Sequence, residues 1–197
     1  MRTTRYANEQ WGNKPIQKRA EPYTAYKYMQ LNRPLTDEFG GHWSLTGSYG
    51  HSFFNPMMVA VCGNHRDHAA PDKNCSCGIY SQTLQNIHDG SDFHSEGSLC
   101  ELSLPGRVLK GSRGYRSSHA LITRIWPGVP DLTDEDVSKI QRDLNVDVSR
   151  IPDLGQNGHN YRSANDWNNL VRTDPYLISQ LKKEQDERQR KLQAEGN

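Results

Sequence analysis

The chain has 197 residues, a formal net charge of +1 and a hydrophobic share of 34%. This length suits one domain with appendages, and the balanced charge excludes a uniformly basic nucleic-acid binder. The 16 glycines and 10 prolines predict many turns around a thin core. No stretch approaches the roughly 20 apolar residues of a membrane helix, so we expect a cytoplasmic protein without membrane contact.

Residues 1–50 carry an excess of basic side chains with interleaved tyrosines and tryptophans. Prolines at intervals interrupt any long helix, which predicts an irregular arm. Positive charge beside aromatic faces suits contact with a nucleic-acid backbone or with another protein. The same composition suits an arm folded over its own domain, since tyrosine and tryptophan are common at partly wet boundaries.

Residues 51–155 contain the predicted core. The apolar run Met57–Val61 has the length of a strand. Ser98–Trp126 is the most strand-like stretch of the chain, and glycines divide it into shorter pieces. These features predict an antiparallel sheet whose strands are short.

Two helices are predicted after these strands. Thr133 is a good N-cap, acidic residues follow in the first turn, and an apolar stripe continues beyond them. Those carboxylates therefore have a structural explanation. Residues 156–197 begin with a turn-rich linker and end in a second helix, where Asp174 supplies an N-cap and Pro175 the first helical position.

Basic side chains occur between residues 102 and 130 without any acidic one. If alternate strand residues share a face, part of this set forms a surface for a phosphate-bearing or acidic partner. A guanidinium beside an aromatic ring suits recognition of phosphate or carboxylate. Such charges are also typical of an ordinary solvated sheet face. The candidate partner-binding residues are Arg107, Lys110, Arg113, Tyr115, Arg116 and Arg124.

Three of the four cysteines lie close together with two histidines. Cys75 and Cys77 form a close pair that does not bridge readily into a disulfide, and Cys62 follows the predicted strand. Thiolates together with an imidazole are typical ligands of structural zinc. The fourth ligand is His65 or His68, and the spacing leaves this choice open. Buried free cysteines are the alternative to a metal site.

A zinc site would offset the thin core. The expected fold is therefore α+β, in which a small antiparallel sheet is stapled by structural Zn2+, with peripheral helices and extended terminal arms. It divides into the arm of residues 1–50, the zinc-stabilised core of residues 51–155, and the linker and helix of residues 156–197.

Two segments resemble a group of small proteins from actinobacteria and their phages. The family pattern is HxAPxxxCxCGIYA followed by GRV and GYRA, and it is similar here to His68–Tyr80, Gly106-Arg-Val and Gly114-Tyr-Arg. The resemblance implies that His68 is the fourth zinc ligand. It also implies a phage or actinobacterial type of protein, in the host cytoplasm if a phage encodes it. It implies no particular reaction.

A site filled by four Cys or His ligands leaves no position for water, which favours a non-catalytic module that binds protein or nucleic acid. A zinc-dependent hydrolase or nucleic-acid enzyme is one alternative. That chemistry needs a carboxylate base near the metal, and turn formation explains the nearby Asp67 and Asp72. A structural component of a large assembly such as a virion is a second alternative, which irregular arms would suit.

A cysteine nucleophile would require Cys100 and His119 to meet. Cys100 lies in a strand-like stretch, which is more typical of core packing than of catalysis. The sequence therefore assigns no catalytic residue.

Overall fold

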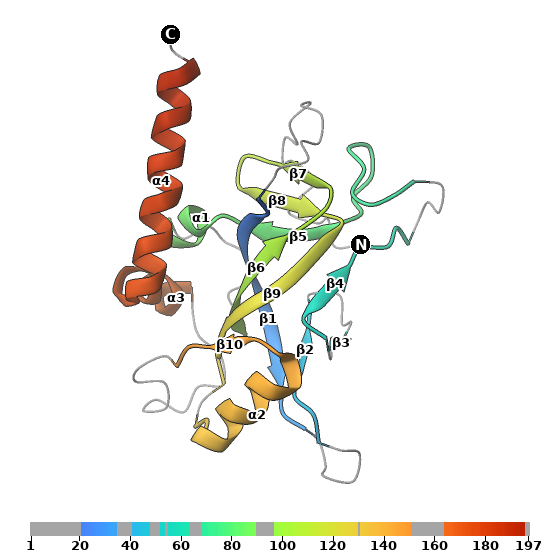
Figure 1. Ribbon diagram of the computed structural model, residues 1–197, viewed down its shortest axis with the longest axis vertical. Helices are drawn as coiled ribbons and strands as arrows, with labels where there is room; N and C mark the ends of the chain where they lie inside the picture. The colour runs from blue at the N-terminus through green and yellow to red at the C-terminus, as the bar shows by residue number, and fades with distance from the viewer. Residues whose placement is uncertain are drawn as a thin grey trace.

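The computed structural model describes residues 21–34, 41–47, 52–53, 55–63, 68–89, 97–129, 131–150 and 164–195. They form an α+β fold, the class that the sequence predicts (Figure 1). The strands are β1 (Tyr23–Asn32), β2 (Ser44–Thr46), β3 (Ser52–Phe53), β4 (Met57–Val59), β5 (Ile79–Gln82), β6 (Ser98–Leu104), β7 (Val108–Lys110), β8 (Gly114–Ser117), β9 (His119–Trp126) and β10 (Asp147–Val148). The helices are α1 (Leu84–His88), α2 (Asp134–Leu144), α3 (Ala164–Thr173) and α4 (Pro175–Glu195).

The strands join in one 10-stranded sheet, which is larger than the small sheet expected from the sequence. Its main order is β10-β9-β6-β1-β5-β8-β7, while β2 pairs with β1 and β3, and β4 pairs with β9. The pairings are antiparallel except that β10 runs parallel to β9. Figure 1 shows β5, β7 and β8 running across the direction of β1, β6 and β9, so the sheet is strongly twisted.

The centre of this sheet is a segment that the sequence predicted to be irregular. Residues 23–32 form β1, which lies between β6 and β5. Ala25 and Met29 enter one apolar core and Tyr26 enters the other. Because both faces are covered, the strand lacks the polar and apolar alternation by which strands are recognised. Of the rest of the expected arm, residues 44–46 form β2, and residues 1–20, 35–40 and 48–50 lie outside the described residues.

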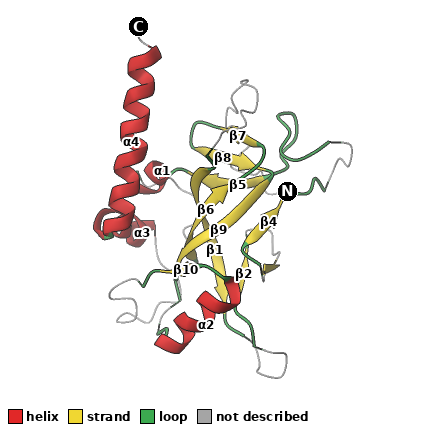
Figure 2. Cartoon of the chain, in the orientation of Figure 1, coloured by secondary structure: helices red, strands yellow, loops and turns green. Residues whose placement is uncertain are grey.

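Each face of the sheet contributes to its own apolar core. Leu99 packs into one core, and its neighbour Cys100 packs into the other, as side-chain alternation along a strand requires. Ile140 and Leu144 of α2 pack into the core that contains Cys100. Helices α1, α3 and α4, which we call the helical layer, cover the other core, in which Trp167 is fully buried (Figure 2).

Helix α2 begins at the predicted cap. Thr133 Oγ1 accepts a hydrogen bond from the Asp136 N–H at 3.1 Å, and Asp136 Oδ2 accepts one from the Thr133 N–H at 3.0 Å. This capping box satisfies two donors that the first turn would otherwise leave unpaired. The acidic first turn is therefore structural, as predicted.

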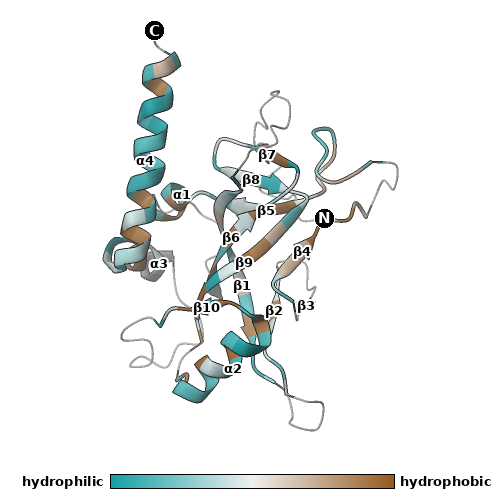
Figure 3. Ribbon diagram, viewed as in Figure 1, coloured by the Kyte–Doolittle hydropathy of each residue, from teal (hydrophilic) through white to brown (hydrophobic). Residues whose placement is uncertain are grey.

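Helix α4 is fastened to the sheet through its cap. Asp174 Oδ1 accepts from the N–H groups of Tyr176 at 2.9 Å and Leu177 at 3.0 Å. Its Oδ2 accepts from Trp126 Nε1 of β9 at 3.0 Å. Residues 185–195 are exposed and mostly hydrophilic (Figure 3). Among the helices that the structure describes, none has both the length and the apolar character needed to cross a bilayer.

Candidate metal centre

Four side chains converge where β4 ends and the chain approaches β5. The ligand atoms of Cys62, His68, Cys75 and Cys77 all lie within 4.8 Å of one another. Cys62 Sγ is 3.6 Å from Cys75 Sγ, and His68 Nε2 is 3.3 Å from Cys77 Sγ. Donors of a tetrahedral zinc site, with Zn–S of about 2.3 Å and Zn–N of about 2.0 Å, are separated by roughly 3.5 to 3.8 Å. The cluster therefore has the dimensions of a metal site.

The thiols of the cluster also have the required chemistry. All four cysteines of the chain are free of disulfides. Burial raises the pKa of Cys77, the neighbouring Cys75 and Cys62 thiols raise it further, and a hydrogen bond from the Asp72 backbone lowers it. Three thiolates this close repel one another, whereas a divalent cation would hold them deprotonated. Three sulfur donors and one imidazole nitrogen suit zinc among the common divalent metals.

Among the described residues, His68 is the histidine whose ligand atom lies in this cluster. Its side chain is half-buried, as are those of Cys75 and Cys77, while Cys62 is buried. The alternative fourth ligand, His65, lies outside the described residues. The choice between the two histidines therefore belongs to experiment.

Residues 68–78, which we call the metal loop, contain hydrogen bonds among their own residues. Asp72 Oδ1 accepts a hydrogen bond from the Asn74 N–H at 2.8 Å, and the Asp72 carbonyl accepts one from the Cys75 N–H at 3.2 Å. This arrangement is an Asx-type turn, which directs the chain back toward the cluster. Turn formation thus accounts for the Asp72 carboxylate.

One buried arginine fills the inside of the metal loop. Arg116 of β8 is 2% exposed, and its guanidinium donates to the Cys75 carbonyl and, at 2.7 Å, to the Asp72 carbonyl. Its Cζ lies 5.8 Å from the centre of the Tyr80 ring. A Cβ at Gly78, whose φ is +125°, would lie 2.6 Å from Arg116 Cγ, so this close approach requires glycine. Arg116 therefore positions the segment that carries two of the cysteines.

The six residues predicted to contact a partner do not share one surface. Arg116 is engaged in the metal loop, and Tyr115 is buried with its ring 4.9 Å from that of Tyr23. Lys110 and Arg113 are exposed around the turn between β7 and β8. All four residues of β8 are buried, so alternation along this strand does not place half of them in solvent.

The remaining two arginines lie elsewhere. Arg124 stacks 4.4 Å from the Tyr176 ring centre and donates to Asp147 Oδ2 at 3.0 Å, where α4 and β10 adjoin β9. Arg107 precedes β7, and its Nη1 donates to the Ala69 carbonyl at 3.3 Å. The exposed and half-buried members of the set thus serve separate parts of the molecule, and a partner for them stays a prediction.

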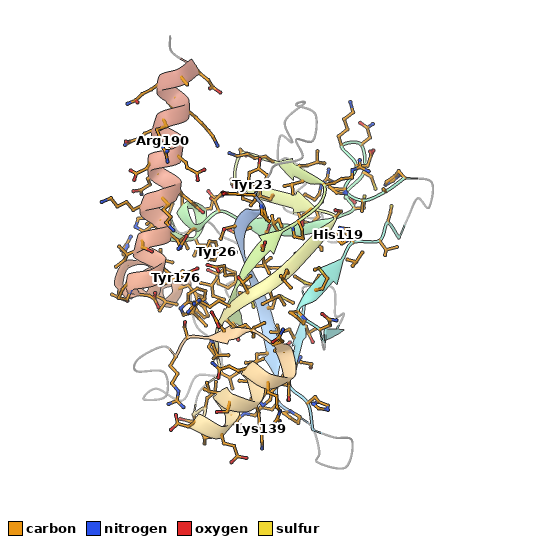
Figure 4. The ribbon with its side chains drawn as sticks, in the orientation of Figure 1. Tyr23, Tyr26, His119, Lys139, Tyr176 and Arg190 are labelled. Carbon is orange, nitrogen blue, oxygen red and sulfur yellow. The ribbon has the colours of Figure 1, made fainter. Side chains whose placement is uncertain are left out.

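Cys100 and His119 are separated by the sheet register. Cys100 is opposite Ile125 of β9, whereas His119 begins that strand, roughly 20 Å away at about 3.3 Å per residue. Figure 4 shows His119 at the end of β9 nearest β4. Burial raises the pKa of the Cys100 thiol to about 12, so it stays protonated at neutral pH. Cys100 is a core residue, as its position in a strand-like stretch predicts.

The metal centre is defined by this geometry alone, because no protein-family model, no curated protein and no solved structure matches the chain.

Proposed function

We propose that the chain is a binding or assembly module stabilised by one structural zinc ion, with Cys62, His68, Cys75 and Cys77 as its ligands. The observation that carries the proposal is the approach of these four donors to within 4.8 Å of one another. Four protein ligands complete a tetrahedron and leave no position for water or substrate, which is the pattern of structural zinc. Its binding energy would add to the folding energy of a loop with little apolar burial.

The charge balance around the loop supports the same proposal. Zinc with three thiolates and a neutral imidazole carries a net charge of −1. A partly buried anionic centre needs nearby donors and cations to offset its charge. The Arg116 guanidinium, held against the Cys75 and Asp72 carbonyls, supplies one positive charge within the loop.

A zinc-dependent hydrolase has less support among the described residues. It would need an open coordination position together with a carboxylate base. The Asp72 carboxylate already accepts the Asn74 N–H at 2.8 Å and shapes the turn. A role in a virion or another large assembly is a variant of the module proposal, in which the assembly itself is the partner. The actinobacterial or phage type remains an expectation from the resemblance.

The proposed partner is a protein or a nucleic acid that meets exposed basic residues such as Lys110 and Arg113. Changing both residues to glutamine should weaken the binding of a copurifying partner, while the zinc content stays the same. Equal recovery of the partner with the double variant would show that this basic turn is only solvated.

Metal analysis of the purified full chain tests the zinc site. We expect about one zinc per chain in the wild type, and loss of that zinc in Cys75→Ser. Cys100→Ser is the matched control, since it changes a cysteine outside the cluster and should keep the metal. Comparing His68→Ala with His65→Ala identifies the fourth ligand. Full zinc retention in Cys75→Ser would contradict the site as described.

Cobalt substitution distinguishes the structural site from the enzyme alternative. Tetrahedral Co2+ bound by thiolates has visible absorption bands that respond to any change of ligand. In a closed site these bands should stay unchanged when azide is added, because no coordination position is open. A spectral change with azide would reveal an exchangeable ligand and would favour the hydrolase.

A further inference from the structure

A recess of about 690 Å3 adjoins the candidate metal centre. On one side it is bounded by residues 60–63 and 68–70, which include the ligands Cys62 and His68. The volume falls within the range of small-ligand sites, which combine apolar walls with a few convergent polar groups. The polar side of the recess is formed by Arg107, Ser118 and His119, beside Gly106.

Small apolar side chains also line the recess. Ala60, Val61, Ala69 and Ala70 all line the recess. The side chain of Val61 is strongly exposed, at 83%, and Val59 two residues earlier is 58% exposed. Apolar side chains left in water beside a recess are typical of surfaces that bind a ligand or a partner. These side chains therefore suit the apolar part of a small ligand.

His119 presents a hydrogen-bond donor on the polar side. Ser118 Oγ accepts from the Arg107 backbone N–H at 3.0 Å and lies 2.8 Å from His119 Nδ1. When the serine hydroxyl donates to Nδ1, the proton of the neutral imidazole lies on Nε2, where it can be donated to a ligand. Gly106, with φ of +86°, permits this packing because a Cβ there would lie 2.8 Å from Ser118 Oγ.

Arg107 adds a positive charge next to that donor. Its Nη1 donates to the Ala69 carbonyl at 3.3 Å, which holds the side chain along the edge of the recess. A guanidinium has five N–H groups in a planar fork, and two of them match the two oxygens of a carboxylate. Arg107 and His119 together offer positioned donors at one side of an otherwise apolar space.

We propose that this recess binds a monocarboxylate, whose oxygens accept hydrogen bonds from Arg107 and from His119 Nε2–H. The apolar part of the ligand lies against Val61 and Ala69. The choice of a monoanion rests on the proposed function, since a filled Cys3His zinc site carries a charge of −1. Arg116 offsets that charge from inside the metal loop, so the single positive charge of Arg107 matches the single negative charge of a carboxylate, whereas a dianion such as phosphate would carry one charge more than Arg107 neutralises.

Two sources share this chemistry. One is a free small acid, and the other is the terminal carboxylate of a polypeptide that ends in an apolar residue. Butyrate represents the small acid, and acetyl-Ala-Ala-Val with a free carboxylate represents the peptide terminus. The affinities of these two probes are compared, and the same peptide with an amidated C-terminus is the control. A free peptide that binds more tightly than butyrate identifies a peptide terminus, and the reverse order identifies a small acid.

An NMR titration of the zinc-loaded full chain with sodium butyrate tests the site. We expect saturable amide shifts at residues 60–63, 106–107 and 118–119. Butyrate should bind at least roughly tenfold more tightly than n-butanol, which lacks the charge, because hydrogen bonds to charged groups are the stronger kind. It should also bind more tightly than inorganic phosphate. Equal binding of butyrate and butanol, or shifts that do not saturate, would overturn the proposal.

Single substitutions distinguish butyrate binding in the recess from attraction to general surface charge. Arg107→Gln should weaken butyrate binding roughly tenfold, and His119→Ala should weaken it several-fold. Lys183→Gln is the matched control, because this exposed lysine of α4 lies outside the recess and should leave binding unchanged. Unchanged butyrate binding in Arg107→Gln would overturn the proposal. If that variant does not fold, the comparison of butyrate with butanol in the wild type decides.

Zinc content, measured on every sample, keeps the two proposals apart. Butyrate binding through Arg107 in a chain that takes up no zinc would contradict the zinc module and leave the carboxylate site standing. A zinc-loaded chain that does not bind butyrate would contradict the carboxylate site alone.

Discussion

The metal loop and the helical layer are attached to the same sheet by different forces. In the metal loop only Ala70 and Pro71 are buried, and the guanidinium of Arg116 supplies its inner contacts. In the helical layer Trp167 and Leu177 are fully buried within an apolar core. Apolar burial contributes about 25 cal/mol for each Å2 removed from water. The helical layer therefore has a source of stability that the loop lacks.

The polar groups of the two regions also differ in how they stabilise the fold. Where the helical layer meets the sheet, the Glu101 carboxylate of β6 accepts from the hydroxyls of Tyr26 at 3.2 Å and Tyr176 at 2.8 Å, which lie between the sheet and α4 (Figure 4). Burial, followed by the hydrogen bond to Glu101, raises the pKa of Tyr176 to about 12. The two tyrosine hydroxyls stay neutral, and their hydrogen bonds add to an apolar core that is already well packed. In the loop, the cation Arg116 and the proposed zinc replace the core.

Removal of the metal should have the largest effect, and it should be confined to one region. Zinc present at a thousandfold excess over its Kd would stabilise the fold by about 4 kcal/mol, and chelation would remove that stabilisation. Hydrogen exchange after chelation should rise in residues 68–78 while the amides of α4 stay protected. Equal deprotection of both regions would show that they unfold as a single unit.

Truncation in the helical layer should produce the converse result. Leu177 is fully buried, so Leu177→Ala should destabilise the protein by about 2 to 5 kcal/mol, measured by urea unfolding. The zinc content should stay unchanged, because none of the four proposed ligands lies in the helical layer. Leu192→Ala on the same helix is the matched control, since Leu192 is 62% exposed and should change stability by less than about 0.5 kcal/mol. Loss of zinc in Leu177→Ala would show that the two regions are coupled.

Substitution of Arg116 should act on the metal loop specifically. Arg116→Met keeps much of the side-chain volume but leaves the Asp72 and Cys75 carbonyls without their donor, at a cost of about 1 to 3 kcal/mol. Zinc affinity should fall at least about tenfold, as for other groups that orient metal ligands. Competition with a chromophoric chelator measures this affinity. Arg113→Met, at an exposed neighbouring position, should keep wild-type affinity, and equal affinity in both variants would contradict the role of Arg116.

Features that depend on neighbouring residues were predictable from the sequence. The Cys75 and Cys77 pair and Cys62 were identified from their chemistry, because metal ligands from a tight turn follow one another closely along the chain. The caps Thr133 and Asp174 were predictable for the same reason, since each bonds to N–H groups two or three residues ahead.

Features that depend on distant residues were not predictable. The central strand β1 was mistaken for an arm because its partners are remote: Tyr26 lies opposite Glu101, 75 positions away. Arg116 looked like a surface residue because its acceptors, Asp72 and Cys75, come 44 and 41 positions earlier. The recess is lined by four separate segments, so the spacing of residues along the chain does not indicate it.

The smallest expected effect concerns a carboxylate that links α4 to α1. Glu184 accepts from the N–H groups of Leu84 at 3.0 Å and Gln85 at 3.1 Å, yet burial raises its pKa above the ordinary value of 4.5. The folded state therefore holds the Glu184 proton more tightly than the unfolded state. Its contribution to stability is fully present below pH 4.5 and declines as pH rises through the higher folded pKa.

Glu184→Gln removes this titration while keeping a carbonyl acceptor for the N–H groups of α1. The stability of the wild type relative to Glu184→Gln should fall as the pH is raised from 4 to 7, measured by urea unfolding at each pH. Glu195→Gln at the exposed end of the same helix should show no such trend. A relative stability that rises with pH would mean that the bonds from Leu84 and Gln85 to the charged carboxylate outweigh its burial. The helical layer would then depend on charge as the metal loop does, and the contrast between the two regions would be lost.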